Sequence, residues 1–199
     1  MDILGVRYRT AVVLFALIIF SAGSSANAYD SGVSYTGIKL GLISSGSVDI
    51  DDNSDNQGAG LSAGFFFDLP LGSRLHYGLS TDLHKMSWSG ERWNNRIDET
   101  GWLLDLGVNL KGNLISEDGP LGIRPGVGAG LGFLGKMDGL GVSGSSYVIV
   151  RAFAEMVYFS PSDVMFVFEG GVWYAPSGGD NVTDVSIGPL LIIRGGVMF

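Results

Sequence analysis

Cysteine is absent from this chain of 199 residues, and charged residues make up only 16% of it. The lack of cysteine excludes disulfides, thiolate metal sites, cysteine nucleophiles and lipid attachment through cysteine. Basic residues are also scarce, with 12 Lys and Arg against 20 Asp and Glu, which gives a formal charge of −8. A chain this acidic is repelled by phosphate backbones, so no nucleic-acid partner is expected.

Long hydrophobic runs are lacking beyond the N-terminus. Arg7 and Arg9 precede an apolar run over residues 11–20, which small residues and Ala26-Asn27-Ala28 follow. This order is typical of a secretory signal peptide, and the run is short of the roughly 20 residues that a membrane-spanning helix needs. We predict a cleaved signal peptide over 1–28 and one domain over 29–199, with a retained helical anchor as the alternative.

Glycine and apolar residues are abundant instead. The chain has 32 glycines and is 46% hydrophobic, and its mean hydropathy of +0.30 is high for an acidic protein. The apolar content excludes disorder, and the lack of a Gly-X-Y period excludes collagen. Charge must therefore be segregated from apolar surface.

Apolar and polar residues alternate with period two in eight segments. Between Trp102 and Leu110 every second residue is apolar, and the residues between are mostly polar or small. Residues two apart share a face of a strand, so each segment predicts a β-strand with one apolar face. The other segments cover about 36–42, 61–68, 75–84, 123–133, 148–158, 166–174 and 187–199, with Ile187 on the apolar face of the last. We predict an all-β fold of eight antiparallel strands.

The charged residues of these segments all lie on the polar faces. They are five acids and five bases: Asp68, Asp82, Asp105, Glu155 and Glu169, and Lys39, Lys111, Arg124, Arg151 and Arg194. A barrel in lipid encloses such charges, and enclosed charges must pair. We predict that seven residues at middle heights form a charge network that closes the lumen: Lys39, Asp82, Asp105, Arg151, Glu155, Glu169 and Arg194. A narrow or gated pore is the alternative.

Aromatic residues and connections also favour a membrane barrel over a soluble periplasmic sandwich. Two outward girdles are predicted, one of Phe67, Tyr77, Tyr158, Phe166 and Phe199 and one of Trp102, Phe133 and Tyr174. Long connections, such as 44–57 and 87–98, alternate with short ones, such as 69–74 and 159–163. Outer-membrane barrels keep their termini and short turns in the periplasm. The prediction is an up-and-down transmembrane β-barrel.

The predicted signal peptide, the eight strands and the C-terminal segment resemble the small eight-stranded outer-membrane barrels, which include the OmpA transmembrane domain, the OmpX/Ail proteins and the opacity proteins. The resemblance implies the outer membrane of a Gram-negative bacterium, contact with its lipid and lipopolysaccharide, and no cofactor. It also implies that the outer-membrane assembly machinery reads the terminal strand through Leu191, Ile193, Val197 and Phe199. We expect a monomer.

The segment 87–96 is the candidate for an external binding loop. Trp88, Arg92, Trp93 and Arg96 are of the residue types that are enriched at binding hot spots. They favour contact with an external protein or surface ligand. The alternative is that the tryptophans lie in the interfacial belt while the arginines meet lipid phosphates.

The sequence supports no catalytic site. His76, Ser80, Asp82 and His84 invite comparison with a nucleophilic triad, but Ser80 and His84 lie about 13 Å apart along one strand. Since some small barrels modify the acyl chains of lipid A, a lipid-A-modifying enzyme is the alternative to a structural or surface-interaction protein.

Two further patterns concern space and metal ions. Gly126, Gly128, Gly130 and Gly132 share an inward face, either to make room for Arg151 and Phe153 or to leave a cavity for a ligand. Asp51, Asn53 and Asp55 imitate the start of a calcium loop, but the chain has Ser62 where the bidentate glutamate belongs. A solvated loop without a metal site is therefore predicted, with weak divalent-cation binding near the lipopolysaccharide surface as the alternative.

Overall fold

The computed structural model describes residues 34–51, 53–72, 74–92, 95–115, 121–140, 142, 144–159, 165–179 and 183–199. The predicted signal peptide over 1–28 lies outside these ranges. None of the helices within them has the length and hydropathy of a membrane-crossing helix.

Strands make up nearly all of the described chain. In chain order the elements are β1 (Tyr35–Ile43), β2 (Gly46–Ile50), β3 (Asn53–Gln57), β4 (Gly60–Pro70), β5 (Leu75–Arg92), β6 (Asn95–Gly112), β7 (Leu114–Ile115), β8 (Leu121–Leu134), the 3-10 helix η1 (Asp138–Leu140), β9 (Ser145–Phe159), β10 (Met165–Gly179) and β11 (Asp184–Met198).

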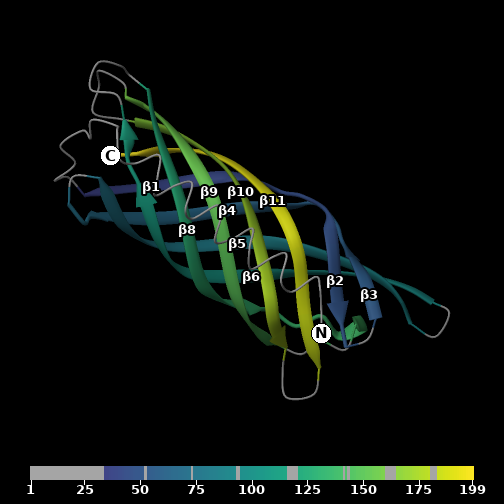
Figure 1. Cartoon of the computed structure of the whole chain (residues 1–199). Helices are drawn as coiled ribbons and strands as arrows, with labels where there is room; N and C mark the ends of the chain where they lie inside the picture. The colour runs from purple at the N-terminus through teal and green to yellow at the C-terminus, as the bar shows by residue number, and fades with distance from the viewer. Residues whose placement is uncertain are drawn as a thin grey trace, which may run out of the picture.

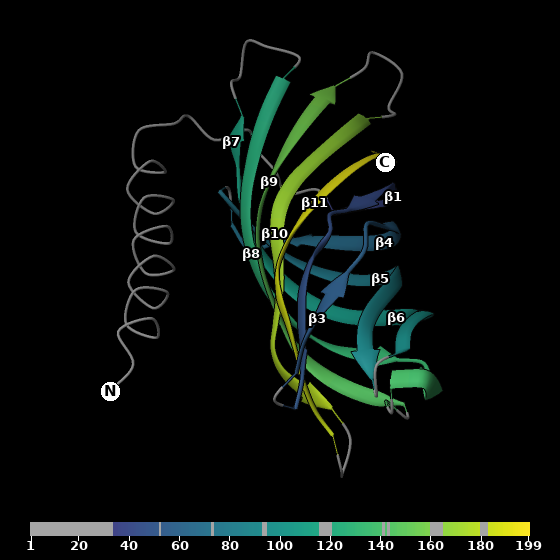
Figure 2. The ribbon, with the colours of Figure 1, turned by 90° about the vertical axis from the view of Figure 1, so that its right-hand side faces the viewer.

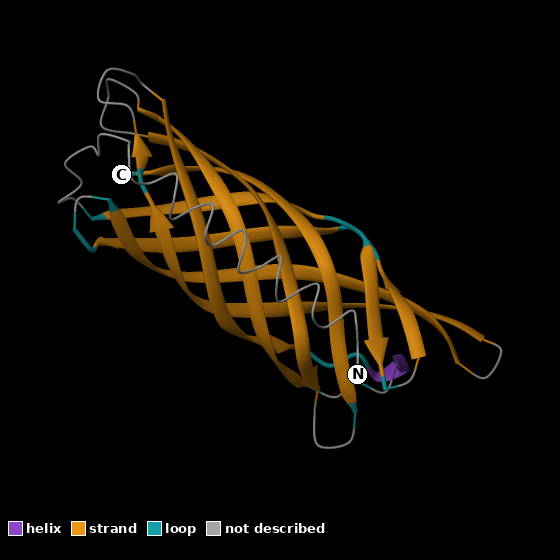
Figure 3. Cartoon of the chain, in the orientation of Figure 1, coloured by secondary structure: helices purple, strands orange, loops and turns teal. Residues whose placement is uncertain are grey.

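Eight long strands close into a ring (Figures 1 and 3). Its order is β1-β4-β5-β6-β8-β9-β10-β11, every pair is antiparallel, and β1 closes the ring by pairing with β11. Closure leaves no open edge along the main wall. The predicted all-β, eight-stranded antiparallel barrel is confirmed.

The hairpin of β2 and β3 prolongs two wall strands. β2 pairs with β11 beyond β1, and β3 pairs with β5 beyond β4. At the junction of β1 and β2 the Ser44 N–H donates to the Leu191 carbonyl over 2.7 Å. The expectation of a loop over 44–57 is therefore wrong, because most of that segment continues the sheet.

β5 and β6 are also longer than predicted. Each has 18 residues, and they pair as far as Arg92 opposite Asn95. The loop predicted over 87–98 is therefore mostly strand. Alternation continues through it with reversed polarity, because Met86 and Trp88 point inward and Ser87 and Ser89 point outward.

The two ends of the barrel differ. The C-terminus and the connection 71–74 lie at one end, here called the terminal end (Figure 1). The β2–β3 hairpin, the far ends of β5 and β6, and η1 lie at the other, here called the distal end (Figures 1 and 2). At the terminal end Gly72 has φ of 88°, which a residue without a side chain adopts readily.

The outer wall is apolar, as the alternation predicts. Exposed side chains include Leu40, Leu79, Leu106, Leu131 and Ile193. The predicted girdle residues also point outward, with Tyr174 partly covered: Phe67, Tyr77, Tyr158, Phe166 and Phe199, and Trp102, Phe133 and Tyr174.

Ile187 is the exception to this pattern. It was expected on the outer face, but it is fully buried. The register between β10 and β11 shifts between Trp173 and Ala175. A shift by one residue moves a side chain to the other face of the sheet, so the face of Ile187 is reversed relative to Leu191.

Candidate functional site

All ten charged residues of the predicted inner faces are buried inside the barrel. Successive side chains of a strand point to opposite faces, so these ten residues point inward while the residues next to them on each strand point outward. Since an unpaired charge in such an enclosure is costly, the pairing among these ten side chains decides what the lumen can do.

One half of the charge network lies toward the distal end. Arg151 Nη1 contacts Asp82 Oδ2 at 2.8 Å and Asp105 Oδ2 at 3.3 Å. Arg194 bridges Asp82 to Glu169, with Nη2 at 2.6 Å from Glu169 Oε1. Glu169 and Arg194 are opposite each other on β10 and β11. Acids and bases therefore alternate across the lumen from Asp105 to Glu169.

The other half continues toward the terminal end. Lys39 Nζ lies 2.5 Å from Glu169 Oε2 and 2.9 Å from Glu155 Oε1. Lys111 Nζ contacts Glu155 Oε1 at 2.9 Å and Asp68 Oδ2 at 2.9 Å. The chain of ion pairs is thus continuous, and the structure brings all seven residues of the predicted network into it.

Three residues join those seven. Asp68 and Lys111 pair as above, and Arg124 contacts both Asp68 and, with its Nη1 at 3.6 Å, Glu155 Oε2. Sequence alternation had placed these three inward, but their position near the terminal end left them outside the predicted network. Long side chains reach along the lumen and close that distance.

Two apolar clusters cap the charge network. At the terminal end Tyr35, Phe66, Val157, Val167 and Met198 pack together, and both Lys39 Nζ and Lys111 Nζ lie 4.6 Å from the Phe66 ring centroid. Toward the distal end a larger cluster, here called the distal core, contains Ile43, Val48, Ile50, Met86, Trp88, Leu103, Leu134, Met137, Val142, Tyr147, Ile149, Trp173, Ala175, Val185, Ile187 and Leu190. The lumen is therefore filled in three layers.

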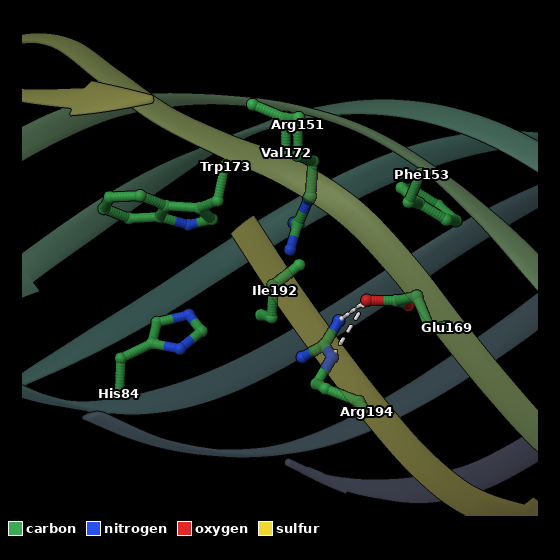
Figure 4. A pocket seen from close by; sticks show the side chains of 8 residues that line it. All are labelled: His84, Arg151, Phe153, Glu169, Val172, Trp173, Ile192 and Arg194. Atoms are coloured by element: carbon green, nitrogen blue, oxygen red, sulfur yellow. Dashed lines mark hydrogen bonds and ion pairs between the residues drawn. The ribbon is translucent and has the colours of Figure 1, made fainter. Parts of the chain in front are cut away.

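A small cavity lies between the charge network and the distal core (Figure 4). His84, Arg151, Trp173 and Arg194 are among its lining residues, and its volume is about 10 Å³. Trp173 Nε1 donates to Asp105 Oδ2 over 3.2 Å, and His84 Nε2 lies 3.9 Å from the same oxygen. A cavity this small holds at most about one water molecule.

The inward glycines provide space for large neighbours. A Cβ at Gly126 would lie 2.6 Å from Phe153 Cε2, one at Gly107 would lie 2.6 Å from Arg151 Cζ, and one at Gly132 would lie 2.7 Å from Ile149 Cδ1. These distances are shorter than real Cβ contacts. The glycine stripe is thus filled by neighbouring side chains, which does not support a ligand cavity there.

Ser80, His84 and Asp82 form no nucleophilic constellation. Ser80 Oγ accepts from Arg151 Nη2 over 2.9 Å and from Asn109 Nδ2 over 3.2 Å. Neither ring nitrogen of His84 has a hydrogen-bond partner among the described residues. His76 pairs instead with Asn113, with 2.9 Å between Nδ1 and Nδ2. A base oriented toward the Ser80 hydroxyl is therefore absent from this group.

Across the described ranges no group of three or more His, Asp or Glu side chains is arranged to hold a metal ion. Asp51 lies at the turn of the β2–β3 hairpin with φ of 52°, and its Oδ1 accepts from the Asp184 N–H over 2.9 Å. The segment with the calcium-like spacing therefore lies in the β2–β3 hairpin.

The candidate external binding loop is divided by the structure. The Trp88 side chain is only 1% exposed and belongs to the distal core, so the interpretation of Trp88 as a contact for a partner or for lipid is wrong. The polar residues on either side of Trp88 made the segment resemble an exposed loop. In the structure those neighbours face outward, and Trp88 between them points inward. Arg96 is exposed and pairs with Asp98 over 3.2 Å. Trp93 and the side chain of Arg92 lie outside the described part of the chain.

A polar groove lies beside this segment at the distal end. Its volume is about 510 Å³, and its lining residues come from β3, β5 and β6: Asn53, Ser54, Asp55, Asn56, Ser89, Gly90, Glu91 and Arg96. Sequence reasoning missed this groove, because it requires β3 and β5 to lie next to each other. The only signal in the sequence was the polar composition of the predicted loops 44–57 and 87–98.

The chain matches a protein-family model. The model is described as Outer membrane protein beta-barrel domain, and it covers residues 12–188. The chain belongs to this family. Among curated proteins none matches it significantly.

Solved structures of this kind agree in fold with the barrel. The outer membrane protein OprG from Pseudomonas aeruginosa is 13% identical over 88% of this chain and 99% of its own, with a TM-score of 0.58. Neisserial surface protein A, NspA, is 13% identical over 83% of this chain and 95% of its own, with a TM-score of 0.53. The resemblance to the small outer-membrane barrels is thereby confirmed at the level of the fold.

As a member of the outer-membrane barrel family, this protein lies in the outer membrane of a Gram-negative bacterium. The exposed apolar band is accordingly its lipid-facing surface. Leu191 and Ile193 on β11 and Phe199 just after it are exposed, and Val197 is partly covered. Recognition of these four residues by the assembly machinery stays a prediction.

Proposed function

We propose that this outer-membrane protein is a non-enzymatic barrel with a closed lumen that acts through its distal surface. The observation that carries the proposal is the three-layer filling of the lumen, with a continuous chain of ion pairs between two apolar clusters. Eight strands enclose a space that side chains can just fill. Neither ions nor substrates then have a path through the barrel.

The fully paired charges argue against a pore. Each of the ten buried charges lies within 4.0 Å of an opposite charge. Opening a path would separate several of these pairs, and each uncompensated charge costs several kcal/mol. Such a lumen favours a structural role for the network.

The enzyme alternative has little support. A lipid-A-modifying enzyme needs polar reactive groups that reach the outer leaflet from the rim. Ser80, Asp82 and His84 point into the lumen, and the Ser80 hydroxyl is already held by Arg151 and Asn109. The protein therefore acts by binding rather than by bond chemistry.

The distal end supplies the surface for such binding. Outer-membrane barrels keep their termini in the periplasm, so the distal end faces the exterior. There β5, β6 and the β2–β3 hairpin extend beyond the lipid-facing band and expose Asp49, Glu91, Arg96 and Asp98. The partners are membrane lipid and lipopolysaccharide around the wall and an external protein or surface ligand at the tip.

Conductance in planar bilayers tests this proposal. The full-length mature barrel is expected to add no discrete current steps, whereas a porin reconstituted in the same way adds them. The charge network can be probed in the same assay with Lys39→Met. Reproducible channel openings by the wild-type barrel would contradict the closed lumen. Deacylation or acylation of lipid A by the purified barrel would contradict the non-enzymatic role.

A further inference from the structure

The distal groove lies where two hairpins diverge. β3 and β5 pair only at Asn56–Ser89 and Gln57–Trp88. Beyond these pairs β3 remains paired with β2, and β5 remains paired with β6, to the ends of both hairpins. Figure 1 shows the two hairpin ends apart from each other. The groove is therefore built by regular strands on both sides, and not by loops.

A buried carboxylate lies at the floor of the groove. Asp55 is 4% exposed although it lines an open groove. A Cβ at position 90 would lie 3.1 Å from Asp55 Oδ2 and closer to the rest of the carboxylate. The missing side chain at Gly90 thus makes room for this carboxylate and keeps the groove open above it.

The remaining lining offers both donors and acceptors. Asn53 and Asn56 carry amides, which donate and accept, and Ser54 and Ser89 carry hydroxyls. Glu91 is acceptor-only and Arg96 is donor-only. A cation would be matched by acceptors alone, and an anion by donors alone. A mixed lining is complementary to hydroxyl groups, each of which donates and accepts.

The net charge of the distal end disfavours anionic ligands. Residues 44–59, 85–101, 135–146 and 175–186 belong to this end. Together they contain ten acidic and four basic residues, which gives a net charge of −6. Two of the four bases are paired with acids of the same end, Arg96 with Asp98 and Lys136 with Asp138. Sulfated or phosphorylated ligands would be repelled at close range. The groove volume of about 510 Å³ lies in the range of roughly 300–1,000 Å³ that is usual for small-ligand sites.

From these observations we infer that the distal groove binds a neutral saccharide. This inference rests on the proposed function, since it names the ligand class of the distal surface. The groove stands above the lipid-facing band, at the level where sugars of the surrounding lipopolysaccharide and sugars from outside the cell both reach the barrel. Asp55 and Glu91 accept from sugar hydroxyls, and the amides of Asn53 and Asn56 bind on the β3 side.

Calorimetric titration of the full mature barrel in detergent micelles tests the inference. The probes are maltotriose, N,N′-diacetylchitobiose and the neutral outer-core oligosaccharide of lipopolysaccharide, free of phosphate and of Kdo carboxylate. At least one is expected to bind with a Kd below about 1 mM. Binding of the core oligosaccharide alone assigns the ligand to the membrane's own lipopolysaccharide, and binding of the other probes assigns it to sugars from outside.

Two glycine variants form a matched pair for this titration. Gly90→Ala displaces the Asp55 carboxylate and is expected to weaken binding about tenfold. Gly135→Ala, at the same end of the barrel, is expected to leave it unchanged, because its new Cβ has only the Trp102 carbonyl nearby, at 3.6 Å. Heat-modifiable gel migration checks that both variants fold. If both bind alike, or if no probe binds at about 10 mM, the inference is overturned.

A charge variant separates a saccharide site from a cation site. Glu91→Gln retains an acceptor oxygen and is expected to keep saccharide binding within about twofold. Spermine is the cationic probe. If spermine bound more tightly than the saccharides, and if Glu91→Gln abolished that binding, the saccharide assignment would be overturned. A barrel that binds none of these probes and remains non-conducting contradicts only the ligand of the groove, whereas channel openings contradict the proposed function itself.

Discussion

The membrane-embedded part of the barrel and its distal extension use the same strands with opposite polarity. On β5 the outward residues Leu79 and Leu83 are apolar and the inward Asp82 is charged. A few residues further along, the inward Trp88 is apolar and the outward Lys85 is charged. The register between β5 and β6 does not shift along this length.

This reversal marks the level at which lipid gives way to water. Lipid accepts apolar side chains on the outer wall, and water accepts polar ones. Trp102 on β6 lies opposite Lys85 on β5, and Thr100 follows it toward the tip. The charge network lies only in the membrane-embedded part, whereas the distal extension is held by the apolar distal core, so the two parts are expected to respond to different substitutions.

The largest effect is expected from breaking the charge network. Glu155 Oε1 lies 2.9 Å from both Lys39 Nζ and Lys111 Nζ. Glu155→Gln keeps the volume but leaves these buried bases short of a counter-charge, which is expected to lower the free energy of unfolding by about 3–5 kcal/mol. Urea unfolding in phospholipid vesicles measures the change. Glu99→Gln in the distal extension serves as the control, and equal losses in both would contradict the role of the network.

A similar but local loss is expected in the distal core. Trp88→Ala removes a side chain that is 1% exposed, at a cost of about 3–5 kcal/mol. Amide hydrogen exchange is expected to accelerate over residues 85–100 while the membrane-embedded strands stay protected. Trp102→Ala changes the same residue type where it is 50% exposed, and it is expected to have a smaller effect. Faster exchange throughout the barrel would show that the two parts unfold together.

The level of the polarity reversal can be tested on one face of one strand. Leu106 and Thr100 both point outward from β6. Leu106→Arg introduces a charge into the lipid-facing band and is expected to cost about 2–4 kcal/mol. Thr100→Arg is expected to change the free energy of unfolding by less than about 0.5 kcal/mol, because its side chain meets water. If both variants were equally destabilised, lipid would extend further toward the tip.

Much of the membrane-embedded part could be predicted from alternation alone. The pattern assigned all ten buried charges to the inside, and it placed Glu169 next to Arg194 on neighbouring strands. What it could not give are the partners across the lumen. Arg194 also contacts Asp82, and these two residues stand on strands that are not neighbours in the ring. Such pairs depend on the tilt and stagger of the closed barrel.

The distal part was predicted poorly for a different physical reason. Segments 44–57 and 87–98 are polar on the outside, which is typical of loops as well as of strands that face water. Val48, Ile50, Met86 and Trp88 carried the signal, since they alternate with polar residues and point inward. The shift that buries Ile187 lies at Gly188-Pro189 of β11, between the pairs Trp173–Leu190 and Ala175–Ile187. A proline inside a strand is typical of a bulge, so the signal for this shift is the proline and not the alternation.

The smallest effect is expected from the exposed ion pair of the distal extension. Arg96 Nε and Asp98 Oδ1 lie 3.2 Å apart, with 74% and 63% of the two side chains exposed. Pairs of this kind contribute about 0.2–1 kcal/mol, because water and salt screen them. Arg96→Ala is therefore expected to shift the urea midpoint slightly at low salt. In 1 M salt, where the Debye length falls to about 3 Å, no shift is expected.

Arg194→Ala is the contrasting variant, since the same residue type there is buried between Asp82 and Glu169. Its loss is expected to persist in high salt, because counterions cannot enter the filled lumen. Salt sensitivity in both variants would mean that solvent reaches the charge network, and would remove the distinction between the two parts of the barrel.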